Sequence, residues 1–173
     1  FKNIEVGASI DLIGEASNYV RNGVSYKTLE KNYLELKKQC TEIKFSITSV
    51  LSMFNAFNLC ELQKHWIEKN YLSAKDLSFD ILVSPSNMSL KCLPLEYKNK
   101  VSKKINVHID FLEKIRDAED LISKWKNAID FMFREDHSYM LESFFKSNDL
   151  RDVHRNQFFE DYFPEYKNLR LNI

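Results

Sequence analysis

Glycine, proline and cysteine are all scarce in this chain, with three of each among 173 residues. The three glycines are spaced wrongly for a dinucleotide- or phosphate-binding loop. Cys40, Cys60 and Cys92 are an odd number at wide intervals, which argues against a disulfide framework. We therefore expect a protein of the reducing cytoplasm whose cysteines behave as small buried hydrophobic residues.

Net charge and long apolar runs are also missing. The 25 basic side chains balance 25 acidic ones, so no overall field attracts nucleic acid or an anionic membrane. No segment approaches the roughly 20 apolar residues that a membrane span needs, and the N-terminal residues lack the pattern of a signal peptide. A hydrophobic content of 44% with 29% charged residues is typical of a globular domain. We predict no nucleic-acid partner and no membrane partner.

The first half of the chain alternates between two periodicities. Apolar and polar residues alternate as in strands at 4–11, 43–50 and 79–84, and helical spacing occurs at 26–40 and 56–70. The order strand, helix, strand, helix, strand predicts right-handed crossovers and a parallel sheet. The pattern therefore indicates an α/β fold.

Each predicted strand keeps one polar face. Strands inside an ordinary doubly wound sheet are buried on both faces and have continuous apolar runs instead. Either a barrel with a polar interior or a sheet with helices on one side and water on the other explains this pattern, and periodicity alone leaves both open. The barrel interpretation predicts that six side chains share one concave face: Ser9, Asp11, Ser46, Thr48, Asp80 and Ser84.

From Pro94 onward the strand pattern disappears. Helical spacing over 97–112 and 122–133 predicts two amphipathic helices, and a third, shorter helix is expected to start at Leu141.

The C-terminal tail combines charged and aromatic residues. Asp152 and Arg155 lie three residues apart, the spacing of a helical ion pair worth about 0.2–0.5 kcal/mol. We expect the aromatic residues that follow to dock the tail onto the body of the protein: Phe158, Phe159, Tyr162 and Phe163.

Short motifs follow one another along the chain in a recognisable order. In sequence they are Ser9-Ile10-Asp11, Tyr19-Val20-Arg21, Ser52–Asn55, the run SFDILVSP, Leu90–Pro94, Asp152 with Arg155, and Phe163-Pro164-Glu165. In this order the chain resembles the later half of radical S-adenosylmethionine proteins that carry a reduced, twitch-like C-terminal region. The resemblance covers nearly the whole chain, and it depends on the collinear order, since no single motif is highly specific.

The resemblance implies both a fold and a chemistry. The fold is a partial (β/α) TIM-like barrel of parallel strands over residues 1–94, with a helical region packed on it over residues 95–173. The parent protein would bind S-adenosylmethionine and a 4Fe–4S cluster, cleave the former reductively and abstract hydrogen from a substrate. Polar groups at the strand ends would contact cofactor and substrate, and these are Ser9, Asp11, Arg21 and Asn55.

Without the resemblance, Asp11 is better explained as a cap of the turn that follows the first strand.

The cysteine motif that makes such a protein an enzyme is absent. The family holds its cluster with a C-x3-C-x2-C loop after the first barrel strand, whereas the gaps between cysteines here are 19 and 31 residues. The resemblance places that loop upstream of Phe1. We therefore expect this chain alone to bind no metal or cofactor and to be catalytically inactive.

Two other classes of function remain open. One is a non-catalytic α/β binding or scaffold protein that has lost the cluster half. The other is an interaction module that works through its helical C-terminal region, which an exposed apolar stripe on residues 97–112 would favour.

A homodimer is also expected. Half a barrel leaves the strand at 4–11 without a neighbour, and an open strand edge recruits another strand unless something covers it. A two-fold dimer through that edge or through the helical tails is the commonest solution. The alternative is that aromatic residues of the tail, Phe158, Phe159 and Phe163, cover the edge within one chain.

Overall fold

The computed structural model describes residues 4–171 and contains one parallel sheet with the strand order β1-β2-β3. The strands are β1 (Glu5–Ser9), β2 (Lys44–Leu51) and β3 (Leu77–Ile81). Parallel pairing of both neighbours confirms the predicted α/β fold. The third strand ends earlier than predicted, because its last ladder bond is donated by the Leu82 amide to Leu51 and the chain turns away before Pro85.

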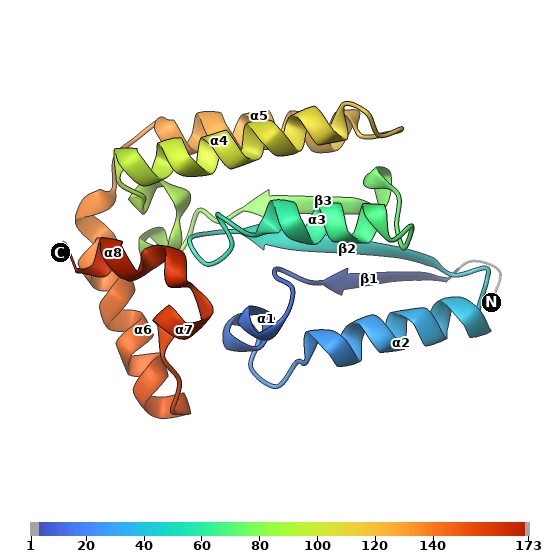
Figure 1. Cartoon of the computed structure of the whole chain (residues 1–173), viewed down its shortest axis with the longest axis horizontal. Helices are drawn as coiled ribbons and strands as arrows, with labels where there is room; N and C mark the ends of the chain where they lie inside the picture. The colour runs from blue at the N-terminus through green and yellow to red at the C-terminus, as the bar shows by residue number, and fades with distance from the viewer. Residues whose placement is uncertain (1–3, 172–173) are drawn as a thin grey trace.

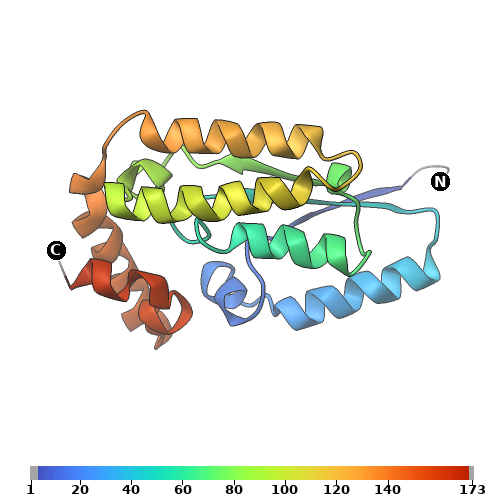
Figure 2. The same cartoon turned by 45° about the horizontal axis from the view of Figure 1, so that its top comes forward.

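The helices of the described residues include all five predicted ones, of which the last is longer than expected, and three short helices that the periodicity did not predict. Their bounds are α1 (Glu15–Val20), α2 (Tyr26–Gln39), α3 (Leu59–Glu68), α4 (Leu95–Leu112), α5 (Glu119–Phe133), α6 (Leu141–Arg155), α7 (Phe159–Tyr162) and α8 (Lys167–Arg170). Helices α2 to α5 cover the same side of the sheet (Figures 1 and 2).

The other side of the sheet is open. Ser9 is in register with Thr48, and Thr48 with Ser78, so their side chains lie on one face. Along this face six side chains are exposed: Glu5, Ser9, Lys44, Ser46, Thr48 and Asp80. The described residues therefore form an open three-stranded parallel sheet with helices on one side.

The prediction of which residues form the polar face is therefore correct for those inside the strands and wrong for the two that lie beyond the strand ends. Asp11 was expected on this face but lies past the end of β1, where it is 7% exposed and bonded to neighbouring elements. Ser84 is exposed but follows the end of β3, so it is not a strand residue.

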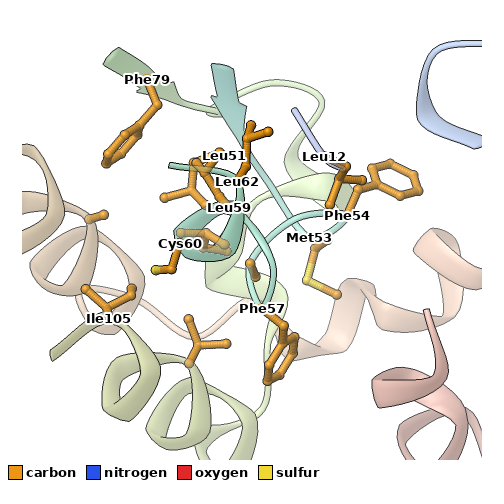
Figure 3. Packing of buried hydrophobic residues seen from close by; sticks show 14 of the residues in the cluster. Leu12, Leu51, Met53, Phe54, Phe57, Leu59, Cys60, Leu62, Phe79 and Ile105 are labelled. Atoms are coloured by element: carbon orange, nitrogen blue, oxygen red, sulfur yellow. The ribbon is translucent and has the colours of Figure 1, made fainter. Parts of the chain in front are cut away.

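The apolar face of the sheet and the helices share one core. Figure 3 shows Leu51 and Phe79 from the sheet together with Leu59 and Leu62 from α3. Burying each such side chain contributes roughly 1.5–3 kcal/mol, so this layer fixes α3 against the sheet. The loop between β2 and α3 is held at both of its ends as a result.

Helices α6 to α8 lie together at the end of the molecule towards which all three strands point (Figure 1). Phe159, Phe163 and Tyr166 are wholly buried, so the tail does dock as predicted, whereas Phe158 is 66% exposed and takes no part. The predicted ion pair within the tail is wrong, because Asp152 and Arg155 each bond to Tyr19 of α1 instead.

The cysteines follow the prediction in part. Cys60 and Cys92 are buried, and the Cys92 thiol donates to the Ser86 carbonyl over 3.0 Å. Cys40 is exposed and is the C-cap residue directly after α2.

Candidate functional site

The structure brings all four predicted site residues together at the carboxyl ends of β1 and β2. Ser9 is the last residue of β1 and Asp11 lies two residues beyond it. Arg21 is the C-cap of α1, and Asn55 belongs to the loop between β2 and α3. Residues up to 46 positions apart in the sequence thus form one connected cluster.

Arg21 joins two of these residues. Its Nε donates to Oδ2 of Asp11 over 2.7 Å, and its Nη2 donates to Oγ of Ser9 over 2.6 Å. Hydrogen bonds from a guanidinium to a carboxylate are charge-assisted and directional, so the plane of the guanidinium is fixed. The Arg21 side chain is still 34% exposed, and Nη1 has no partner among the described residues. The cluster therefore presents a positively charged N–H group to solvent.

Both carboxylate oxygens of Asp11 accept hydrogen bonds. While Oδ2 accepts from Arg21, Oδ1 accepts from the Val50 amide of β2 over 2.8 Å. These partners lie on α1 and β2, so Asp11 links the end of β1 to other elements. Among residues 4–171, the Asp11 carboxylate accepts no hydrogen bond from the turn that follows β1, so it does not cap that turn.

Asn55 is wholly buried behind this cluster. Its Nδ2 donates to the carbonyls of Asp11 (3.2 Å) and Val50 (3.0 Å), and its Oδ1 accepts from the Ser52 amide (2.8 Å). These bonds satisfy backbone groups that the ladder leaves unpaired at the strand ends. Asn55 therefore tethers the two strand ends.

The residue that sequence reasoning missed is Ser49. It occupies an apolar-phase position of β2, where it is 1% exposed and its hydroxyl donates to the Ile10 carbonyl. The available signal was a hydroxyl residue at a position where the strand pattern calls for an apolar one. Ser49 completes the set of bonds that hold the end of β1 against β2.

The open face next to the cluster carries further hydroxyl groups. Ser46, Thr48 and Ser78 have no side-chain hydrogen bond within the described part of the chain. A ligand on this face would meet free hydroxyls along the sheet and the guanidinium of Arg21 at its end.

A groove lies between α3 and α4, with a volume of about 600 Å³ and ten lining residues. Phe57, Cys60 and Phe111 contribute apolar surface, and Val107 on the α4 wall is 63% exposed. Four lysines also line it, namely Lys64, Lys100, Lys103 and Lys104. The rest of the apolar stripe of α4 faces the core, since Val101, Ile105 and Leu112 are fully buried.

Between residues 4 and 171 no three His, Cys, Asp or Glu side chains are grouped as a metal site would need. Within the same range, no helix is both long and apolar enough to cross a membrane.

Comparisons with protein-family models, with curated proteins and with solved structures found no match for this chain. The functional interpretation therefore depends on the geometry of the cluster and on the collinear motifs of the sequence.

Proposed function

We propose that this chain is the later part of a radical S-adenosylmethionine-type barrel, and that its open sheet face lines the interior of the parent protein. The observation that carries the proposal is the cluster of Ser9, Asp11 and Arg21 at the carboxyl end of β1. In barrels of alternating strands and helices, ligands bind at this end of the strands.

Two further features support the proposal. The strands follow one another in sequence order, with helices on one side, as neighbouring strands of such a barrel do. The open face is polar, and a polar face is expected where a barrel interior holds a ligand. A one-sided sheet facing water explains the polar face alone, but it gives no reason for a fixed arginine at the strand ends.

The chain's own residues supply binding groups. Ser9 offers a hydroxyl, and Arg21 offers a cationic N–H that no described residue occupies, which suits ribose hydroxyls or an anionic group. Asp11 holds the arginine in place. In the parent, a 4Fe–4S cluster with S-adenosylmethionine would supply the reductive cleavage, and no step of that cleavage is assigned to this chain.

Titration of the ¹⁵N-labelled chain with S-adenosylmethionine tests the proposal. We expect weak binding, with a Kd on the order of 1 mM, since the other half of the site is missing. Shifts should centre on the amides of Ser9 and Thr48, and Arg21→Ala should abolish them. The matched control Lys27→Ala alters an exposed cation on α2 and should leave them unchanged. Absence of shifts at millimolar ligand, or shifts that survive in Arg21→Ala, would contradict the proposal.

The groove between α3 and α4 favours a second candidate, a non-catalytic binding protein that acts through its helical region. Its apolar surface suits the apolar body of a ligand and Lys103 offers a cation for an anionic head group, whereas Lys100 and Lys104 already pair with Glu96 and Glu61. Titration with dodecanoate separates the candidates: shifts at Val107 that Val107→Asp abolishes support the groove. An unchanged spectrum in that titration rules out this second candidate.

A further inference from the structure

Tyr19 is held at both ends by a helix more than 130 residues away in the sequence. Its hydroxyl donates to Oδ1 of Asp152 over 2.8 Å, and its carbonyl accepts from Nη1 of Arg155 over 2.8 Å. The ring is wholly buried and packs edge-on against Phe159 and Phe163, with centroids 5.9 and 5.5 Å away. Burial, followed by the bond to Asp152, raises the pKa of the Tyr19 hydroxyl, so that the hydroxyl remains a donor.

Arg155 serves as a helix cap across the fold. The last carbonyls of any helix have no partner within it, and basic side chains commonly bond to them. Helix α1 has no basic residue in its last turn, and Arg155 of α6 supplies the bond to the Tyr19 carbonyl instead. The last turn of α1 is therefore completed by the C-terminal region.

Asp152 links Tyr19 of α1 to the start of α7 in the C-terminal tail. Its Oδ1 accepts from Tyr19, and its Oδ2 accepts from the Phe159 amide at the start of α7 over 2.7 Å. Asp152 is 8% exposed, so one buried carboxylate joins α1, α6 and α7. Removing any of these partners leaves a buried polar group unpaired.

Arg21 follows directly from this anchored turn. It is the C-cap of α1, its amide donates to the Ser17 carbonyl over 2.8 Å, and it stands two residues after Tyr19. Its guanidinium reaches Asp11 and Ser9 from that position. The backbone from which Arg21 extends is thus fixed by bonds that α6 makes.

We propose that Asp152 and Arg155 are positioning residues for Arg21, so that the cluster at the strand ends is complete only when α6 is docked on α1. The relevance of this positioning to ligand binding rests on the proposed function. The positioning itself is a property of the chain and is measured without a ligand.

The test follows the Nε–H of Arg21 by NMR in the full chain. In Arg155→Ala we expect its exchange with solvent to rise about tenfold, the effect of losing roughly one hydrogen bond's stabilisation. Arg155→Lys keeps a donor for the Tyr19 carbonyl and should restore much of the protection. His154→Ala, an exposed neighbour on α6, is the matched control and should show no change.

A comparison with core amides separates positioning from general stability. If Arg155 acts only on global stability, protection of the Phe79 amide in β3 falls by the same factor as that of Arg21. Equal losses at the two groups would overturn the proposal, and so would wild-type protection of Arg21 in folded Arg155→Ala. If Arg155→Ala does not fold, Tyr19→Phe, which removes only the bond to Asp152, gives the same comparison. Failure of S-adenosylmethionine to bind would leave these measurements unaffected.

Discussion

His108 and Trp125 donate to the same acceptor, Oε1 of Gln63, over 2.9 and 2.8 Å. An indole N–H is only a donor, so the Gln63 oxygen has to face Trp125. His108 must then also donate, which assigns the proton to Nε2 and makes the ring neutral unless Nδ1 is protonated too. Burial, with a smaller effect of Lys64, lowers the pKa of His108 to about 4.

This lowered pKa predicts a loss of stability in mild acid. The unfolded chain takes up a proton near the ordinary pKa of about 6.5, whereas the folded chain resists it down to about 4. The stabilisation is therefore present above pH 6.5 and is lost as the pH falls towards 4. We expect the free energy of unfolding to drop by on the order of 3 kcal/mol over that range from this group. Urea unfolding at several pH values measures it.

The control for this prediction is His108→Gln, which cannot titrate. Its stability at neutral pH is expected to be lower, and its loss between pH 6.5 and 4 should be smaller than that of the natural chain. An equal loss in both proteins would show that other groups cause it.

Asn55 should contribute more to stability than a loop residue ordinarily does. Asn55→Ala removes three bonds to backbone groups at the strand ends and leaves those groups buried. We expect a loss of about 3 kcal/mol in the free energy of unfolding, measured with urea. Asn99→Ala, at an exposed position of α4, is the matched control and should change it by less than about 0.5 kcal/mol. An equally small loss of unfolding free energy in both variants would contradict the role of Asn55 as a tether of the strand ends.

The isolated chain is expected to hold no iron–sulfur cluster after anaerobic reconstitution. Clusters need several convergent thiolates. Cys60 and Cys92 are buried, and burial raises the pKa of both thiols, that of Cys92 to about 11. Iron and sulfide are measured after gel filtration, with a variant lacking all cysteines as the control. Stoichiometric retention of both elements in the natural chain alone would contradict the prediction.

The open edge of the sheet leads us to expect a dimer. Strand β1 pairs only with β2, so its other edge has unpaired backbone groups within the described residues. Sedimentation at micromolar protein should show concentration-dependent association. Gly7→Lys adds a charge to the edge strand and should abolish it, whereas Ser46→Lys on the central strand should not. A single species of 20.5 kDa at all concentrations would refute dimerisation.

Local pattern was enough to predict most of the elements. The helix expected at 26–40 runs over Tyr26–Gln39, and the strand expected at 43–50 runs over Lys44–Leu51. Both depend on apolar spacing within one segment, which the sequence displays directly. The polar phase of the strands followed from the same spacing. The assignment of Ser9, Asp11, Arg21 and Asn55 to a ligand site came from the collinear motifs and stays a prediction.

The hydrogen-bond partners of the buried polar side chains were decided only by the tertiary structure. The spacing of Asp152 and Arg155 suggested that they pair with each other, yet both bind Tyr19, 133 residues from Asp152. Likewise, Ser49 stands at an apolar position, and its acceptor is the carbonyl of Ile10, 39 residues away and just past the end of β1. Periodicity states which face of an element is buried, but a hydrogen bond depends on which other element packs there. That is settled by the packing of α6 on α1 and of β1 on β2, where a buried polar group takes the nearest partner that satisfies it.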